Sequence, residues 1–358
     1  MPTKPDQHAR SHRMSPQNAA RISAGIEAWF TANARDLPWR RHRNGYTALV
    51  AEAMLQQTQV SRVIDAFERF VARFPTVNAL ACADEQAVLA AWQGLGYYRR
   101  ARNLHRAAQI IANEHGNEVP CDAETLRKLP GVGRYTAGAI SSIVFGAREP
   151  IVDGNVQRVL ARLFDDDRPT TSPEAVRAAW DRAKTLVTVA DNPARLNEGV
   201  MELGAMICRP QQPRCDACPV RQVCKAHRDG IVERIPPPRQ AASRSVLHFH
   251  SVMIQRGERV LLERRPDEGL WAGLWQFPTV ETDAPKQPTA LGDQLGFPLC
   301  RSSRSETHIV TLTHRTVHVH LYHAATRARR LGETRRWFNP GDALALPLAN
   351  VTKRLLMA

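Results

Sequence analysis

The hydrophobic positions of the first 228 residues repeat at the spacing of α-helices. Ile22, Ile26 and Phe30 fall on one helical face, and Ser15 followed by Pro16 matches an N-cap with proline at the first helical position. The same period predicts further helices over residues 46–57, 63–71, 88–92, 99–114, 123–128, 135–145, 155–163, 173–187 and 194–206. Because no segment before residue 230 has the alternation of a strand, this part is predicted to be all-α.

The pattern changes after the proline-rich segment Ile235–Gln240, which we interpret as a stiff linker. Strand-like runs follow at Val246–Ile254, Val260–Glu263 and His308–Tyr322, and a short helix is predicted at Val351–Leu356. The fold class is therefore multi-domain, an all-α domain followed by an α+β domain. The predicted boundaries are a disordered basic tail at 1–17, a helical domain at 18–228, a linker at 229–243 and the α+β domain at 244–358.

Basic residues outnumber acidic ones. Lys+Arg 49 against Asp+Glu 35 gives a formal net charge of +14 and a pI near 10.1, which favours a polyanionic partner such as nucleic acid. A charge that serves solubility alone is the alternative. The N-terminus lacks the apolar core of a signal peptide, and no stretch has the apolar length of a membrane span. We expect a soluble, cytoplasmic protein, associated with a bacterial nucleoid and not with a membrane.

Four of the seven cysteines, Cys208, Cys215, Cys218 and Cys224, are separated by only six, two and five residues. Thiolates at such spacing form a metal site, and the candidates are a four-thiolate zinc ion or a cubane iron–sulfur cluster. A zinc ribbon usually has two C-x-x-C pairs and this run has one, so spacing alone favours iron–sulfur by about two to one. The other three cysteines are isolated, so no disulfide framework is predicted.

The segment Leu129–Tyr135 reads L-P-G-V-G-R-Y and stands between two predicted helices. Gly131 and Gly133 permit a tight hairpin with positive φ. Backbone amides beside a helix N-terminus can bind a phosphate, and carbonyls can bind a cation that bridges to one. This is the helix–hairpin–helix pattern of sequence-independent DNA binding, and a plain turn between two helices is the alternative.

A second segment combines aromatic rings with positive charge. Gly94–Arg100 places Tyr97 and Tyr98 directly before two arginines. This composition suits stacking on bases and pairing with phosphates. Core tyrosines beside a solvated basic turn are the alternative.

Two acidic residues are the candidates for acid–base chemistry. Asp153, in I-V-D-G-N, precedes a predicted helix, and the amides of a helix start keep a carboxylate ionised, as an anion beside a developing sugar cation must be. The alternative is that Asp153 only caps the helix. Glu52 shares a helix face with Gln56 by its i, i+4 spacing, and the alternative there is a solvated polar stripe.

Taken in order, these motifs resemble one family. L-P-G-V-G, followed twenty residues on by Asp153 and then by the four cysteines, is similar to the helix–hairpin–helix glycosylase superfamily with its [4Fe-4S] loop. The strings M-L-Q-Q-T-Q-V, G-L-G-Y-Y and D-G-N-V-x-R-V-L-A-R resemble the adenine DNA glycosylase (MutY) family over residues 20–228. The resemblance implies a [4Fe-4S] cofactor on the four cysteines and a partner duplex with an 8-oxoguanine:adenine mispair. We expect the protein to be a monomer.

The implied activity is excision of adenine opposite 8-oxoguanine, and opposite guanine, by base flipping and hydrolysis of the N-glycosidic bond. Glu52 would be the general acid that protonates adenine N7, with a pKa raised by burial, and then the base that activates water. Asp153 would stabilise or trap the sugar cation, with Tyr135 and Asn155 orienting both groups. Bifunctional relatives carry a nucleophilic Lys at the position of Tyr135, so a monofunctional glycosylase is predicted.

The resemblance also implies contacts with the substrate and with DNA. Gln56 and Tyr97 match the residues that enter the duplex when the base is flipped. The hairpin glycines, Gly131 and Gly133, match the backbone contact to DNA. The wall of the adenine pocket is matched by Arg35, Trp39, Arg40, Leu55 and Glu198.

The segment 261–278 resembles the Nudix-like C-terminal domain of this family. True Nudix hydrolases continue with a Glu-rich helix that holds magnesium, which the stretch 279–295 lacks, so a binding domain without pyrophosphatase activity is predicted. The family reads 8-oxoguanine through an F-S-H loop, matched here by Leu312, Thr313 and His314, with Leu for Phe and Thr for Ser. The alternative is that His314 merely belongs to a strand.

Two other functions stay open on sequence. One is an endonuclease III–like bifunctional glycosylase and lyase for oxidised pyrimidines, which Tyr135 and the C-terminal domain disfavour. The other is a non-catalytic iron–sulfur protein that binds DNA or senses redox state. In that case Glu52 and Asp153 would have no chemical role.

Overall fold

The computed structural model describes residues 14–238, 244–283, 288–328 and 331–357. The chain divides into two compact units. The first comprises Met1–Gln56 and Ala107–Gln240, and the second comprises Gln57–Arg106 and Ala241–Ala358. The predicted tail and linker fall partly on residues 1–13 and 239–243, which lie outside the described residues.

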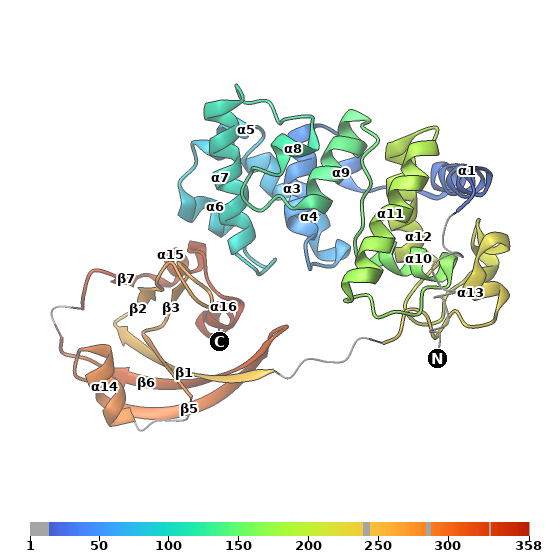
Figure 1. Ribbon diagram of the computed structural model, residues 1–358. Coiled ribbons are helices and arrows are strands. Elements are labelled where there is room, and N and C mark those ends of the chain that lie inside the picture. The colour runs from blue at the N-terminus through green and yellow to red at the C-terminus, as the bar shows by residue number, and fades with distance from the viewer. Residues whose placement is uncertain (1–13, 239–243, 284–287, 329–330, 358) are drawn as a thin grey trace, which may run out of the picture. The chain divides into compact units, whose positions relative to one another are not determined.

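Helices joined by loops form the described chain up to residue 228 (Figure 1). Ser15 caps the first helix by accepting a hydrogen bond from Asn18 N (3.2 Å), and Pro16 opens it, as predicted. In this part of the described chain there is no strand, which confirms the all-α prediction, and across all described residues no helix is long and apolar enough to cross a membrane. The helices are α1 (Pro16–Asn33), α2 (Pro38–Arg41), α3 (Gly45–Leu55), α4 (Val60–Arg73), α5 (Val77–Ala81), α6 (Glu85–Ala91), α7 (Arg99–Glu114), α8 (Ala123–Leu126), α9 (Arg134–Phe145), α10 (Gly154–Phe164), α11 (Pro173–Val189), α12 (Pro193–Met206) and α13 (Lys225–Arg228).

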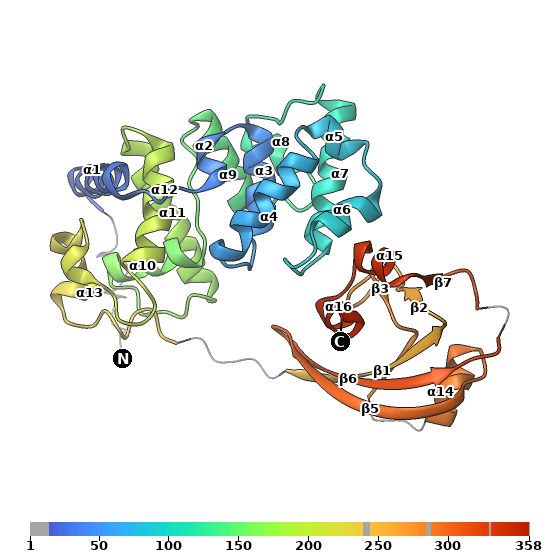
Figure 2. The ribbon, with the colours of Figure 1, turned by 180° about the vertical axis from the view of Figure 1, so that it is seen from behind.

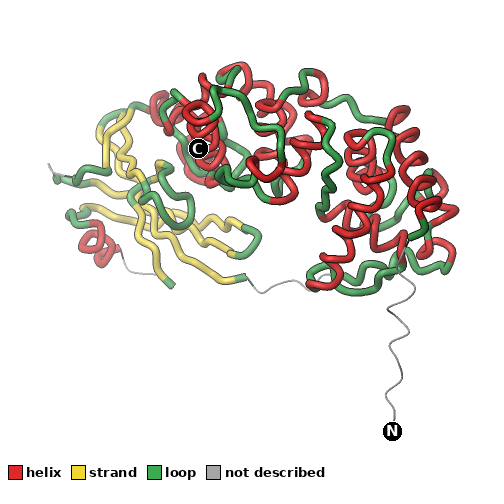
Figure 3. The backbone as a smooth tube through the Cα atoms, turned by 45° about the horizontal axis from the view of Figure 1, so that its top comes forward, coloured by secondary structure: helices red, strands yellow, loops and turns green. Residues whose placement is uncertain are grey.

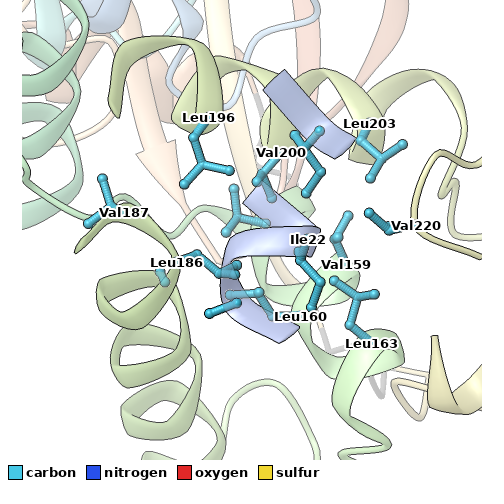
Figure 4. Close-up of a cluster of buried hydrophobic side chains, with 14 of the residues drawn as sticks. Ile22, Val159, Leu160, Leu163, Leu186, Val187, Leu196, Val200, Leu203 and Val220 are labelled. Atoms are coloured by element: carbon cyan, nitrogen blue, oxygen red, sulfur yellow. The ribbon is translucent and has the colours of Figure 1, made fainter. Parts of the chain in front are cut away.

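The first unit is organised by a core in which α1, α10, α11 and α12 meet (Figure 4). Ile22 of α1, Leu160 of α10 and Val200 of α12 are each at most 5% exposed, and burying a side chain of this size stabilises the fold by about 1.5–3 kcal/mol. Gly199 lets α12 approach α1 closely, because a Cβ there would lie 2.7 Å from Ile26 Cγ2. This packing fixes α12, which also contacts α9, as a rigid support.

The second unit contains a seven-stranded sheet in the order β3-β2-β1-β6-β5, with β4 paired to β1 and β7 to β2. Figure 2 shows the long strands β1, β6 and β5 next to one another. β1 and β6 are parallel, and the other pairs are antiparallel. All strands of the described chain follow residue 244 (Figure 3), so this part is α+β as predicted. The elements are β1 (Ser245–Arg256), β2 (Arg259–Arg264), β3 (Trp275–Gln276), β4 (Thr279–Thr282), α14 (Pro288–Leu295), β5 (Cys300–Thr311), β6 (Arg315–Ala325), β7 (Arg335–Phe338), α15 (Pro340–Ala345) and α16 (Asn350–Met357).

One predicted strand is wrong in its extent. The run His308–Tyr322 is not continuous, because β5 ends at Thr311 and β6 begins at Arg315. Leu312 N donates a hydrogen bond to Arg315 O (2.8 Å), which closes a turn over residues 312–314. His314 therefore lies at the tip of a hairpin and not within a strand.

The histidine-rich runs of β1 and β6 form an internal network. His248 Nδ1 lies 2.9 Å from His320 Nε2, and the rings of His250 and His320 are stacked with centroids 4.8 Å apart. His320 Nδ1 lies 2.9 Å from Thr307 Oγ1 on β5. These imidazoles are therefore bonded to one another and to neighbouring hydroxyls inside the sheet.

Within the second unit, the C-terminal elements pack against the start of α7. The Tyr98 hydroxyl donates to Leu348 O (3.1 Å) in a buried contact, and Arg102 Nη2 donates to Ala272 O (2.7 Å). The G-L-W-A-G-L-W segment is thus attached to the helix that follows G-L-G-Y-Y. Of the two tyrosines, Tyr98 is a core residue, whereas Tyr97 is 46% exposed.

Candidate active site

Glu52 projects from α3, a helix with a strong local start. The Asn44 side chain accepts from Thr47 N (2.9 Å) and Thr47 Oγ1 accepts from Asn44 N (3.0 Å), a reciprocal capping box. The helix ends at Leu55, two residues before the predicted end, so Gln56 is its C-cap and not part of a polar helical stripe. The position of Glu52 is thus fixed from both ends of a short helix.

The environment of Glu52 favours a protonated carboxyl. Burial raises the pKa of Glu52 to about 7, the charge of Asp153 adds to the rise, the hydrogen bond with Tyr135 opposes it, and the charge of Glu198 adds further. The predicted rise in pKa by burial is confirmed in direction. A carboxyl group with a pKa raised in this way can hold a proton near neutral pH.

Asp153 is the N-cap of α10. Its Oδ1 accepts from Val156 N (2.7 Å) and its Oδ2 accepts from Asn155 Nδ2 (3.2 Å). Burial raises the pKa of Asp153, although these hydrogen bonds and the charge of Arg158 lower it. Desolvation thus outweighs the hydrogen bonds from the helix start in its effect on the pKa of Asp153. Asp153 therefore both caps α10 and acts electrostatically on Glu52.

Tyr135 lies beside both carboxyl groups. Its hydroxyl forms a hydrogen bond with Glu52 and lies 3.1 Å from Met201 Sδ. Burial, followed by the charges of Glu52 and Asp153, raises the pKa of Tyr135 well above its usual value. The phenol therefore stays neutral, and it can donate a proton in a hydrogen bond without giving it up.

The glycine hairpin connects α8 to α9. Gly131 has a φ of +79°, as predicted, whereas Gly133 has a φ of −87° and serves as the N-cap of α9. A Cβ added at Gly133 would have no described atom within 4 Å, so the space beside this backbone position is open. Gln56 Nε2 donates to Gly131 O (3.5 Å), which brings these two predicted DNA contacts together.

Five charged side chains join the segment 35–43 to α12; they are called the arginine–glutamate cluster here. Arg35 Nε lies 2.7 Å from Glu202 Oε1, Arg40 Nε lies 2.9 Å from Glu198 Oε1, and Arg43 Nη2 lies 2.8 Å from Glu198 Oε2. Sequence reasoning found Arg35, Arg40 and Glu198 but missed Arg43 and Glu202. The i, i+4 spacing of the two glutamates on one helix was the available signal.

The other two predicted pocket residues are Trp39, within the segment 35–43, and Leu55, a short distance after it in the sequence. Trp39 is on α2 and Leu55 ends α3, and both side chains are half-buried. The charge of Glu198 acts on both Glu52 and Tyr135. The arginine–glutamate cluster therefore borders the pair of carboxyl groups.

Arg158 of α10 was also missed by sequence reasoning, and it links the carboxyl pair to the cysteine loop. Its Nη2 donates to Asn155 Oδ1 (2.9 Å) and to Gly204 O (2.8 Å), while its Nε donates to Cys208 O (2.8 Å). Asn155 in turn donates to Asp153. One guanidinium thus connects the first of the four cysteines to the cap of α10.

The four cysteines lie on the loop between α12 and α13 and are all partly buried. Burial raises the pKa of Cys218 to about 12, and the charges of the other three thiols contribute, so the four act on one another. Arg162 Nη1 donates to Cys208 Sγ (3.3 Å). In the described ranges, no group of three or more His, Cys, Asp or Glu side chains is arranged to hold a metal ion.

The remaining predicted contacts belong to the second unit. Tyr97 has a φ of +46°, Arg100 lies over its ring at 5.5 Å, and its hydroxyl forms a hydrogen bond with Thr313 Oγ1. Leu312 is half-buried, while Thr313 and His314 are exposed in the hairpin turn. The structure therefore brings Tyr97 and the 312–314 turn together.

Comparison with protein families defines the class. The family described as "HhH-GPD superfamily base excision DNA repair protein" matches residues 50–184, and the NUDIX domain family matches residues 250–358. The chain thus combines a region similar to helix–hairpin–helix base excision repair proteins with a region similar to NUDIX domains. Adenine DNA glycosylases from two sources align over most of the chain. The Rattus norvegicus protein is 38% identical over 75% of this chain and 62% of its own length, and the Buchnera aphidicola (subsp. Schizaphis graminum) protein is 34% identical over 71% and 73%.

The chain belongs to the adenine DNA glycosylase family. It spans about three-fifths of the length of the mammalian relatives that it matches, for example 57% of the Homo sapiens protein. Its relatives include bacterial and eukaryotic proteins. The predicted family and the predicted fold class are therefore confirmed.

Solved structures agree with the helical fold. A thermostable thymine-DNA glycosylase is 27% identical, covers 60% of this chain and 100% of its own, and superposes with a TM-score of 0.55. A trapped endonuclease III–DNA covalent intermediate is 23% identical, covers 61% and 100%, and has a TM-score of 0.51. The second similarity concerns the fold alone.

Proposed function

We propose that this protein excises adenine from duplex DNA at mispairs with 8-oxoguanine and with guanine, acting as a monomer and as a monofunctional glycosylase. The observation that carries the proposal is the interacting pair of Glu52 and Asp153, with Tyr135 bonded to Glu52. Membership of the adenine DNA glycosylase family supports the choice of base. The net charge of +14 suits a phosphate backbone.

The adenine is flipped out of the stack, because its glycosidic bond is inaccessible inside a duplex. Gln56, beside the hairpin, and Tyr97 enter the duplex in its place. The wall of the pocket is assigned to Arg35, Trp39, Arg40, Leu55 and Glu198. The hairpin glycines, Gly131 and Gly133, hold a backbone phosphate.

Glu52 transfers its proton to adenine N7, so that the bond between C1′ and N9 breaks with its electron pair going to the base, which leaves neutral. A pKa of about 7 suits this role, because an acid works best near the operating pH. Asp153 lies next to the sugar cation that forms and stabilises it electrostatically. Water then adds to C1′ and returns a proton to Glu52.

Tyr135 and Asn155 orient the two carboxyl groups through their hydrogen bonds to Glu52 and Asp153. A Schiff base with the abasic sugar needs an amine, which the phenol of Tyr135 lacks. The reaction therefore ends at the abasic site. Strand cleavage follows only when alkali is added.

Cys208, Cys215, Cys218 and Cys224 would hold a [4Fe-4S] cluster. The donor set fits, since four thiols share one loop and Arg162 donates to Cys208 Sγ, as suits an anionic sulfur. When bound, the cluster orders the loop and takes no part in the hydrolysis.

Replacing one of these cysteines should therefore impair structure and not chemistry. Cys218→Ser is expected to lose most of its iron and to bind duplex DNA at least about tenfold more weakly, because ligand loss frees the loop. Iron content and gel-shift titration measure this. Cys82→Ser, an exposed and isolated cysteine, is the control. Full iron content in Cys218→Ser would contradict the assignment.

The 312–314 turn is assigned to recognition of the lesion. His314→Ala is expected to lower the preference for 8-oxoguanine over guanine opposite adenine by about tenfold, since one lost polar contact costs about 1–2 kcal/mol. Excision rates on the two duplexes give the ratio. His323→Ala, an exposed histidine of the same hairpin, should keep the wild-type ratio. An unchanged ratio in His314→Ala would move lesion reading elsewhere.

The direct test of the function uses the iron-loaded full chain and duplexes with adenine opposite 8-oxoguanine, guanine or thymine. Free adenine and alkali-labile ends are expected from the first two duplexes. Borohydride should trap little or no protein on the DNA, because no Schiff base forms. The proposal would be overturned if none of the duplexes released adenine, or if borohydride trapped the protein efficiently on the DNA.

A further inference from the structure

The arginine–glutamate cluster has an order that suggests different roles for its two carboxylates. Along it the charges alternate as Arg35, Glu202, Arg40, Glu198 and Arg43. The charge of Glu198 acts on Glu52 and on Tyr135. Glu202 accepts more hydrogen bonds from the arginines than Glu198 does.

Glu202 is the most deeply buried member of the cluster, with 2% of its side chain exposed. Its Oε1 accepts from Arg35 N (3.0 Å) and Nε (2.7 Å), and its Oε2 accepts from Arg35 Nη2 (2.8 Å). Arg40 adds contacts from Nη1 to Oε1 (3.4 Å) and from Nη2 to Oε2 (3.3 Å). Burial works to raise the pKa of Glu202, but the bonds from Arg35 and Arg40 prevail and hold it at about 2, so the carboxylate is charged at every working pH.

The two arginines need such an anchor, because their backbone gives them little support. Arg35 lies outside any helix, and Arg40 is on α2, which is only four residues long. Holding a long side chain in one rotamer costs conformational entropy. Glu202, in contrast, stands on α12, which is fixed by buried Val200 and Leu203.

The geometry also determines which part of Arg35 stays available. Its Nε and Nη2 edge is bound to Glu202 as a bidentate pair. The planar guanidinium therefore directs its Nη1 edge away from Glu202, and 35% of the side chain is exposed. Guanidinium donors match the acceptor nitrogens of a purine ring.

We propose that Glu202 is a positioning residue of the base pocket, which orients Arg35 and Arg40 before the flipped purine arrives. The inference rests on the proposed function, since it assigns the pocket's ligand to a purine with ring-nitrogen acceptors. Glu202 touches no substrate and acts through the two arginines. Its loss should weaken productive seating of the base and leave binding of the DNA backbone intact.

The test compares Glu202→Gln with Glu202→Asp in single-turnover excision of adenine opposite 8-oxoguanine. Glu202→Gln is expected to lower excision about 10²-fold, the scale of a displaced positioning group. It should bind a duplex with a tetrahydrofuran abasic site in place of the adenosine as tightly as wild type. Glu202→Asp, which keeps the charge, should recover part of the loss. Glu174→Gln removes an exposed ion pair with Arg177 and is the matched control.

A double-mutant cycle with Arg35→Ala separates positioning from general stability. If Glu202 acts through Arg35, the double variant is expected to be no worse than the weaker single variant, whereas additive losses would overturn the proposal. Should Glu202→Gln not fold by circular dichroism, the cycle is run with Glu202→Asp. If wild type excises adenine and Glu202→Gln is equally active, this inference is wrong and the proposed function stands. If wild type is inactive, the proposed function itself is wrong.

Discussion

Glu52→Gln is expected to bind the mispaired duplex with wild-type affinity and to release adenine about 10²–10⁴-fold more slowly, the usual contribution of a general acid. The amide keeps the shape of the side chain and can still bond to Tyr135, but it has no proton of suitable acidity to give to the base. Release of free adenine in single turnovers measures the effect.

The control for Glu52→Gln is Glu68→Gln, which removes an exposed glutamate from α4. It should excise adenine at the wild-type rate. Excision by Glu52→Gln within about tenfold of wild type, at equal DNA occupancy, would show that another group protonates the base.

The pKa of Glu52 also predicts the pH dependence of excision. Because the acid must hold its proton before reaction, and because burial raises its pKa to about 7, the rate should be highest below pH 7. Above that value it should fall about tenfold for each pH unit. A pH–rate profile of single-turnover excision measures this. A rate that stays constant from pH 6 to pH 9 would contradict the role of Glu52 as the acid.

Local signals in the sequence were sufficient to predict much of the fold. Helix periods and caps are local, so α1 and α10 could be placed from Ser15 and Asp153 with their neighbours. The spacing of the four cysteines alone predicts a metal site. Glu52 and Tyr135 needed the family resemblance, because periodicity by itself favours a solvated stripe for Glu52.

Features that depend on distant pairing were missed. The ion pairs of Arg43 and Glu202 form only because the fold places the segment 35–43 against α12. Arg158 likewise acts through backbone carbonyls near residue 204, which are distant from it in the sequence. The turn at 312–314 was hidden because it has no Gly or Pro and lies between two β-rich runs. The rise in the pKa of Asp153 could not be predicted, because burial cannot be read from a cap motif.

Asp153→Asn is expected to lower excision of adenine by about 10²–10³-fold, the scale of removing one group that stabilises charge in the transition state. The amide Oδ1 can still accept from Val156 N, so the start of α10 should be kept while the negative charge is lost. The rate of adenine release at saturating enzyme measures the loss, and thermal unfolding checks the fold.

The matched control for this change is Asp122→Asn, which replaces the aspartate cap of α8, where the side chain accepts from Thr125 N (2.8 Å). Both variants exchange a capping carboxylate for an amide, but only Asp153 lies beside Glu52. If the capping role were the whole role of Asp153, the two variants would show equal and small losses. A large loss of excision rate in Asp153→Asn alone would instead show that the negative charge of Asp153 stabilises the sugar cation. Both carboxylates cap a helix, but only that of Asp153 lies beside Glu52.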